Sequence, residues 1–274
     1  MKPEEIEKLE IELLLEAVFR RYGYDFRNYS YPSIRRRVWH RIAAEAVTGI
    51  AALQEKVIRD PACMNRLFYD FSINVTEMFR DPLFFLSMRE NVIPLLRTYP
   101  FIRIWVAGCS TGEEAFSLAI LLEEEGLLSR SRIYATDMNA RVLQQAAEGR
   151  ISLKTMKDDT DNYRKAGGKR ALSDYYTVKS NEAVFHSPLK ECLVFAQHNL
   201  VTDKSFNEFH LILCRNVLIY FNRTLQEHVH DLFYKSLSPF GFLGLGNKES
   251  IRFTKHAQQY KDVDVQEKIY RKIT

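Results

Sequence analysis

The chain has 274 residues, of which 46% are hydrophobic and 12% aromatic, enough for one large or two small domains with packed cores. No apolar run approaches membrane-spanning length, and the charged start lacks a signal-peptide pattern, which predicts a cytoplasmic protein. The net charge of +4 is unremarkable as a total. The four cysteines are Cys63, Cys109, Cys192 and Cys214. They form no C-x-x-C pair, which favours buried thiols over disulfides or a metal site.

The first eighty residues show helical patterns and no strand pattern. Apolar faces predict helices over residues 4–22, from Pro32, after Gly49 and from Pro61. We therefore expect a small helical bundle at the start of the chain.

Arginines concentrate on the second predicted helix and just before it. Between residues 20 and 41 there is a single acid, Asp25, against seven arginines: Arg20, Arg21, Arg27, Arg35, Arg36, Arg37 and Arg41. This local excess predicts an acidic partner surface, on a protein or a nucleic acid. The alternative is a merely solvated helix face, although such a face usually mixes both signs of charge.

From residue 101 the pattern alternates strands and helices, which is typical of a parallel sheet. An apolar helix over about 84–96 precedes this region, and the polar residues Asn74, Thr76 and Arg80 come before that helix. They could simply cap it. The predicted strands are 102–107, 132–137, 193–199, 209–214, 242–246 and a closing antiparallel strand at 268–273, with helices from 115, over 139–147 and over 224–237.

The alternation breaks between Arg150 and Leu193. Residues 163–170 form a turn-rich basic stretch, and two short strands are predicted at 175–179 and 182–186. An insertion of this length is usually functional or a small subdomain, so we expect a β hairpin here.

The strand over residues 102–107 runs directly into a turn bracketed by Gly108 and Gly112, and a helix follows at once. Glycines let a ligand approach the backbone, and a helix N-terminus offers unpaired N–H groups. An ordinary βα turn without a ligand is the alternative, because Gly-x-x-x-Gly is a weak signal.

Acidic residues indicate which ligand this turn would suit. Asp137 ends the second strand, 29 residues after Gly108, where it could bind the hydroxyls of a ribose. Glu113 and Glu114 at the helix start would repel a pyrophosphate and suit a cationic ligand such as S-adenosylmethionine. This favours a methyltransferase over a dehydrogenase, although glutamates also stabilise helix N-termini.

Several segments carry a family resemblance: Asn-Val-Thr-Glu-Met-Phe-Arg at 74–80, Ser-Thr-Gly-Glu-Glu at 110–114, Ala-Thr-Asp at 135–137, His-Asn-Leu at 198–200 and Cys-Arg-Asn-Val-Leu-Ile-Tyr-Phe at 214–221. In this order they resemble the chemotaxis receptor methyltransferase (CheR) family, which methylates glutamate side chains on the cytoplasmic helices of bacterial chemoreceptors. The resemblance covers essentially the whole chain.

The resemblance implies an α/β fold in two parts. A small all-α N-terminal bundle with the basic helix would occupy residues 1–78. A class I, Rossmann-like S-adenosylmethionine methyltransferase domain would occupy 79–274, with an antiparallel β subdomain inserted at 160–193.

The resemblance also implies a role for each matching residue. The cofactor would be S-adenosylmethionine, with S-adenosylhomocysteine as its product, bound by Asn74, Thr76, Arg80, Gly108, Glu114, Asp137, Asn199, Leu200, Arg215 and Asn216. Arg80 and Tyr220 would be the catalytic residues. The substrate would be bound by the basic helix through Arg35, Arg36, Arg37 and Arg41.

The implied partner is the cytoplasmic domain of a methyl-accepting chemoreceptor, without nucleic acid or membrane insertion, and we expect a monomer without a metal. The turn at 179–182 has no glycine, which favours action independent of a receptor C-terminal peptide. Two alternatives stay open: a nucleic-acid methyltransferase that contacts phosphates through residues 20–41, and a sensor that binds the cofactor without transferring methyl. The presence of Arg80 and Tyr220 argues against the sensor.

Overall fold

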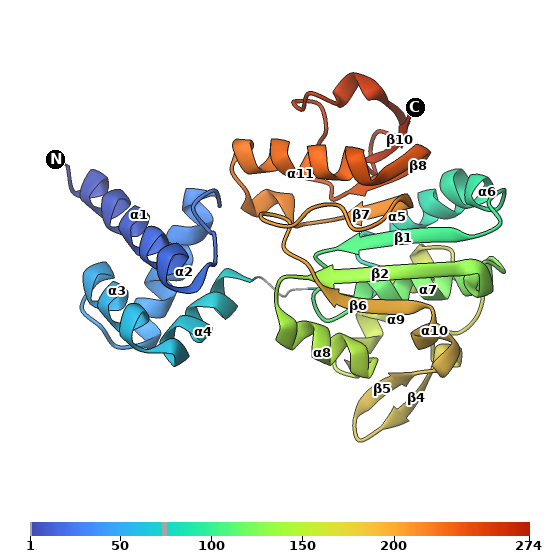
Figure 1. The fold of residues 1–274 in the computed structure, drawn as a ribbon. Coiled ribbons are helices and arrows are strands. Elements are labelled where there is room, and N and C mark those ends of the chain that lie inside the picture. The colour runs from blue at the N-terminus through green and yellow to red at the C-terminus, as the bar shows by residue number, and fades with distance from the viewer. Residues whose placement is uncertain (1, 73–75) are drawn as a thin grey trace. The chain divides into compact units, whose positions relative to one another are not determined.

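The computed structural model describes residues 2–72 and 76–274 of the chain (Figure 1). Two compact units make up the protein. The first comprises Met1–Ile73 and Ile219–His228, and the second comprises Asn74–Leu218 and Val229–Thr274. No helix in the described ranges is long and apolar enough to cross a membrane.

The first unit contains the four helices that the sequence predicts: α1 (Pro3–Tyr22), α2 (Tyr31–Ala44), α3 (Ile50–Arg59) and α4 (Pro61–Phe71). Gly23 ends α1 in the left-handed conformation with φ of 78°, and its N–H donates to the Phe19 carbonyl. Asp60 caps α4 by accepting a hydrogen bond from the Ala62 N–H at 2.9 Å. Short-range signals therefore place these helix ends.

The segment Ile219–His228 packs with these helices although it lies far along the chain. The Ser30 N–H donates to the Tyr220 carbonyl at 2.8 Å. Tyr29 and Phe221 form an antiparallel bridge with their rings 5.0 Å apart. No periodicity in the sequence indicates this pairing, because it joins residues almost two hundred positions apart.

The second unit is built on a seven-stranded sheet in the order β6-β2-β1-β7-β8-β10-β9. Its strands are β1 (Ile102–Ala107), β2 (Ser131–Asp137), β6 (Leu193–Gln197), β7 (Phe209–Cys214), β8 (Leu237–Leu245), β9 (Tyr260–Asp264) and β10 (Ile269–Lys272). The pairs from β6 to β8 are parallel, whereas β10 is antiparallel to both β8 and β9. The closing antiparallel strand is thus confirmed, and β9 is an element that the sequence analysis missed.

Helices cover both faces of this sheet (Figure 1). Trp105 of β1 contacts Phe233 of α11 (Arg223–Ser236) on one face, with ring centroids 5.4 Å apart. Ile104 and Val106 point to the other face, into the main core beneath α7 (Glu113–Glu124). The remaining helices beside the sheet include α8 (Ala140–Glu148) and α10 (Ser187–Glu191).

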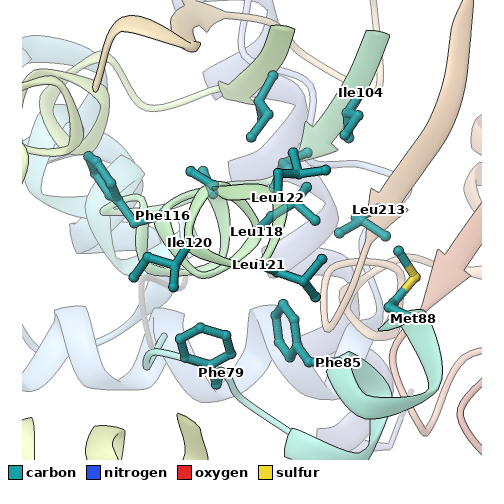
Figure 2. Packing of buried hydrophobic residues seen from close by; sticks show 14 of the residues in the cluster. Phe79, Phe85, Met88, Ile104, Phe116, Leu118, Ile120, Leu121, Leu122 and Leu213 are labelled. Carbon is teal, nitrogen blue, oxygen red and sulfur yellow. The ribbon is translucent and has the colours of Figure 1, made fainter. Parts of the chain in front are cut away.

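The core around α7 explains why that helix is apolar all round. Every residue from Ala115 to Leu122 is buried. Figure 2 shows Leu118, Leu121 and Leu122 between the strands and a second layer that contains Phe79 and Phe85. A helix that is covered on both sides has no need of a polar face.

Apart from Phe79, which precedes it, that second layer is the predicted apolar helix over 84–96. The structure divides this helix into α5 (Pro82–Ser87), a π-helical turn η1 (Met88–Val92) and α6 (Ile93–Leu96). Pro94 provides the reason. It has no N–H to donate to the carbonyl four residues earlier, and its ring crowds that carbonyl, so the regular ladder cannot pass through it.

The region between Arg150 and Leu193 holds a second sheet in the order β3-β5-β4, with β3 (Arg150–Ser152), β4 (Tyr176–Lys179) and β5 (Glu182–Phe185). The hairpin of β4 and β5 is confirmed, and β3 adds a third strand. One expectation was wrong: residues 163–165 are not part of a turn but end the helix α9 (Met156–Lys165). This helix is polar along most of its length and buries Asp159 and Tyr163, so it has no apolar periodicity.

Candidate functional site

The strand order itself locates the candidate site. β1 has β2 on one side and β7 on the other, so the connections leave these central strands in opposite directions. In open α/β sheets, ligands bind in the crevice outside the carboxyl ends of the strands at such a switch point. Most of the candidate residues in the second unit follow β1, β2, β6 and β7 directly, at this one edge.

The turn after β1 depends on its glycines. The N–H groups of Gly108 and Cys109 both donate to the Thr136 carbonyl, at 2.8 and 2.9 Å. Gly108 has φ of 78°, and a Cβ there would lie 2.5 Å from Cγ2 of Val217, which follows β7. Only glycine therefore fits this position without strain and a clash.

Asp137 is fixed at the end of β2 by backbone donors. Its Oδ2 accepts from the Ser110 N–H at 3.0 Å, and its Oδ1 accepts from the Asn139 N–H at 2.9 Å. Burial raises the pKa of this carboxyl, and the backbone N–H groups act in the opposite direction. The Met138 N–H acts on the same carboxyl, and because a carboxylate has about four lone-pair sites, Asp137 can still accept a hydrogen bond from a ligand hydroxyl.

Arg215 joins the start of α7 to the loop that precedes α5. Its Nη1 donates to Glu114 Oε1 at 2.6 Å, and its Nη2 donates to Asp81 Oδ2 at 2.7 Å and to the Arg80 carbonyl at 2.9 Å. The guanidinium lies over the Phe84 ring, 4.1 Å from its centroid, and the side chain is 2% exposed. Because both Nη atoms are hydrogen-bonded within the protein, we propose that Arg215 acts on a cofactor mainly by positioning other residues.

Thr76 and Arg80 lie on that loop, Thr76–Asp81, and both are partly exposed. Asn74 lies outside the described residues. Phe79 and Asp81 have φ of 50° and 54°, in the left-handed region that side chains rarely adopt. The Phe79 N–H donates to Ser117 Oγ of α7 at 2.8 Å.

The residues after β6 lie beside Asp137, since the His198 N–H donates to the Asp137 carbonyl at 3.1 Å. Asn199 folds back on its own turn, where its Oδ1 accepts from the Val201 N–H at 3.0 Å. Leu200 is 7% exposed. This segment is therefore a compact turn with a buried apolar residue.

Asn216 follows β7 with φ of 60°, and Glu249 holds it there. Glu249 Oε2 accepts from the N–H groups of Asn216, at 3.1 Å, and Gly246, at 2.7 Å. Sequence reasoning missed Glu249 because it belongs to none of the recognised segments and is 33 residues from Asn216.

Three buried polar atoms at this edge have no hydrogen-bond partner among the described residues: Ser110 Oγ, His198 Nδ1 and Arg215 Nε. Buried polar atoms in folded proteins are normally paired, so such atoms are available to a ligand. Glu113 accepts from the Thr111 hydroxyl at 2.7 Å, and burial raises the pKa of its carboxyl. Glycine backbone, the Asp137 carboxylate and the acidic helix start together fit a nucleoside with a cationic group.

A separate surface hollow of about 520 Å³ lies at the opposite edge of the sheet, lined in part by Ser131, Arg132 and Cys192 at the amino ends of β2 and β6. None of the candidate residues lines this hollow. Strand direction and chemistry therefore both place the site at the carboxyl edge instead.

Tyr220 belongs to the first unit, where its ring lies beneath the guanidinium of Arg37, 5.5 Å from its centroid. Arg37 also donates to the Ser33 hydroxyl at 2.8 Å and is 8% exposed. The structure therefore brings together Tyr220 and the basic helix, two features that the sequence analysis treated separately.

The positive charge of α2 is smaller than the sequence count suggests. Arg35 pairs with Glu7 of α1 at 2.8 Å, and Arg41 pairs with Asp70 of α4 at 2.6 Å. Arg41 is 9% exposed, so it and Arg37 are not surface residues as a substrate-binding role requires. Arg35 and Arg36 are exposed, and the substrate-binding role of the basic helix stays a prediction. The count was misleading because the neutralising acids lie on other helices.

The mostly parallel sheet with its antiparallel β10, together with a glycine turn and strand-end carboxylate, defines a Rossmann-like methyltransferase domain. Comparison with known families agrees. Residues 74–269 match "CheR methyltransferase, SAM binding domain", and residues 9–72 match "CheR methyltransferase, all-alpha domain". The chain belongs to the CheR family of S-adenosylmethionine-dependent methyltransferases, which confirms the resemblance, the fold and the cofactor.

Curated relatives cover most of the chain. "Putative methyltransferase Cher3" of Pseudomonas putida is 48% identical, over 96% of this chain and 97% of that protein. A "Chemotaxis protein methyltransferase" of Listeria innocua is 28% identical over 86% of this chain and 87% of its own length. "Chemotaxis protein methyltransferase 2" of Vibrio cholerae is 30% identical over 69% of this chain and 70% of its own length.

Proposed function

We propose that this protein is a cytoplasmic protein-glutamate O-methyltransferase. It transfers methyl from S-adenosylmethionine to glutamate side chains on the cytoplasmic helices of a chemoreceptor, which gives glutamate methyl esters. The observation that carries the proposal is the Arg215 contact set. It ties Glu114 at the start of α7 to Arg80 and Asp81, so hydrogen bonds join the cofactor turn to the proposed catalytic loop.

The geometry and the family resemblance support the proposed cofactor-binding residues. Asp137 accepts hydrogen bonds from the ribose hydroxyls through the lone pairs that the backbone leaves open. Asn199 and Leu200 flank the adenine, and Gly108 and Asn216 line the site between them. Thr76 and Arg80, together with Asn74, approach the methionine end, and Glu114 lines the same pocket.

The chemistry needs no general base. The bound cofactor supplies a methyl group activated by a cationic sulfonium. A substrate glutamate has a solution pKa of about 4.3 and is already ionised at neutral pH, so the protein has only to desolvate and align it. Positioning of this kind can lower a barrier by about 7–11 kcal/mol.

Arg80 is the proposed orienting group for the substrate carboxylate. An arginine that paired tightly would stabilise the ionised ground state and slow the attack. Arg80 should therefore orient the substrate carboxylate rather than neutralise its charge. Tyr220 is the second proposed catalytic residue and would supply a hydrogen bond and shape. Exposed Arg35 and Arg36 on α2 would contact the acidic receptor helices.

The test is methyl transfer from tritiated S-adenosylmethionine to chemoreceptor-rich membranes. We expect protein-bound label that mild base releases as methanol, since an ester is base-labile and an N-methyl group is not. Asp137→Ala should abolish incorporation at low cofactor concentration, and Asp158→Ala, which changes an exposed aspartate, should not.

The alternatives give different results in the same assay. Cofactor binding without transfer to any receptor would indicate a sensor and contradict the proposal. Label in added RNA or DNA, with binding that weakens steeply as salt rises, would indicate a nucleic-acid methyltransferase. Peptides from receptor C-termini, titrated against the protein, test the expectation of peptide-independent action.

A further inference from the structure

Helix α9 turns one face towards the loop Thr76–Asp81. Asp159, Asn162 and Tyr163 are spaced i, i+3 and i+4, so they share that face. Asp159 Oδ1 accepts from the Met78 N–H at 3.0 Å, and Asn162 Nδ2 donates to the Met78 carbonyl at 3.3 Å. α9 therefore pairs both backbone groups of Met78.

The next residue along the loop is held by the same helix. The Tyr163 ring packs on the Phe79 ring with centroids 5.1 Å apart, and Tyr163 is 1% exposed. Its hydroxyl donates to the buried Glu124 of α7, and the Arg170 N–H donates to that hydroxyl at 3.1 Å. Tyr163 thus contacts the loop through its ring and is itself held in place through its hydroxyl.

The loop requires such support because of its backbone. Phe79 and Asp81 both have positive φ, and a residue in this region persists only where the surrounding structure holds it. Ser117 and Arg215 hold the loop from α7 and from the end of β7. The contacts from α9 come from the part of the chain that matches no recognised motif.

We propose that Asp159 is a positioning residue, which with Asn162 holds the loop Thr76–Asp81 in the conformation that presents Arg80 to the reaction. This inference rests on the proposed function of Arg80. Asp159 is 1% exposed, and burying a carboxylate is costly unless hydrogen bonds compensate it. The contact of Asp159 with the loop gives α9, the helix of the inserted region, a role at the catalytic site.

The test compares Asp159→Ala with Asp158→Ala, which removes the same charge from the exposed neighbouring residue of α9. Two quantities are measured on the full chain: hydrogen exchange of the Met78 amide, and kcat together with the dissociation constant for S-adenosylmethionine. A hydrogen bond to a charged group supports an increase in Met78 exchange of roughly 10–100-fold in Asp159→Ala.

We expect kcat to fall in Asp159→Ala by at least about 10-fold, because displaced reacting groups lose rate steeply, with cofactor affinity within about 3-fold of the parent. Asp159→Asn keeps an oxygen that accepts from the Met78 N–H and should restore most of kcat. A purely structural role would lower the melting temperature and raise exchange across the unit without this rescue.

Unchanged Met78 exchange in Asp159→Ala would overturn the proposal, and so would raised exchange with normal kcat. If Asp159→Ala does not fold, Asn162→Ala, which removes only the contact to the Met78 carbonyl, must show the same local change at smaller size. If the parent protein transfers no methyl to receptors, the proposed function fails. The exchange measurement still decides whether Asp159 holds the loop.

Discussion

Replacing Arg215 with alanine is the sharpest test of how the site is built. The change removes a cation whose side chain is 2% exposed and which pairs with Glu114, 13% exposed, and Asp81, 31% exposed. Breaking a buried ion pair by removing one partner costs about 3–5 kcal/mol, because the remaining charges stay buried without compensation. Asp81 is more exposed to solvent than Glu114, so most of this loss of stability should come from the pair with Glu114.

The measurement is urea unfolding of Arg215→Ala against the parent chain, followed by a signal from the second unit. We expect the free energy of unfolding to fall by about 3–5 kcal/mol. For a unit of this size the melting temperature would fall by roughly 6–20 °C. Arg164→Ala is the control within the same unit, since Arg164 is 74% exposed and pairs with Asp161 at 3.8 Å, a contact worth at most about 0.5 kcal/mol.

A loss below about 1 kcal/mol in Arg215→Ala would refute the reasoning, because it would put the pair in the range of a solvent-screened surface contact. Arg215→Lys separates charge from shape. It retains the cation but not the fork that spans Glu114 and Asp81, so it should recover only part of the stability.

The remaining predictions concern the reaction and its pH dependence. Arg80→Ala should lower kcat at least about 100-fold while cofactor affinity stays within a few-fold, since it orients the substrate; near-normal turnover in steady-state kinetics would contradict its role. Asp137→Asn should weaken S-adenosylmethionine binding by roughly 10–100-fold in calorimetry, because a charged acceptor for the ribose hydroxyls is lost; unchanged binding would remove Asp137 from the site. Burial lowers the pKa of His230 to about 4 from its ordinary 6.5, so the unfolded chain binds this proton first as the pH falls. Its contribution to stability should therefore be lost between about pH 6.5 and 4, by up to about 3 kcal/mol, and urea unfolding of His230→Leu should show a shallower pH dependence than the parent.

Much of the fold could be predicted because its signals are local. Gly23 and Asp60 end or begin helices through contacts within a few residues, and the strand of residues 102–107 alternates as a buried strand should. Asp137 followed from its place at a strand end, since parallel strands bring their carboxyl ends to one edge of the sheet. The domain boundary near residue 78 and the individual site roles stay predictions.

What could not be predicted depends on pairs that are distant in the sequence. α9 buries a carboxylate and a tyrosine, so it lacks the apolar periodicity by which a helix is recognised in a sequence. Its polar sequence therefore resembles that of a turn. Glu249 and Ser117 hold backbone N–H groups of Asn216 and Phe79, and a lone Glu or Ser in a sequence indicates no such partner.

By itself the sequence determined the helical start of the chain, the alternating α/β region, the glycine turn and the family to which these segments belong. Only the tertiary structure decided which charges are available. Arg37 and Arg41 are buried within the first unit, and Arg215 is committed to Glu114, a partner 101 residues away. The physical reason is that an ion pair depends on distance in space and on exclusion of water, and neither quantity is recorded in the order of residues.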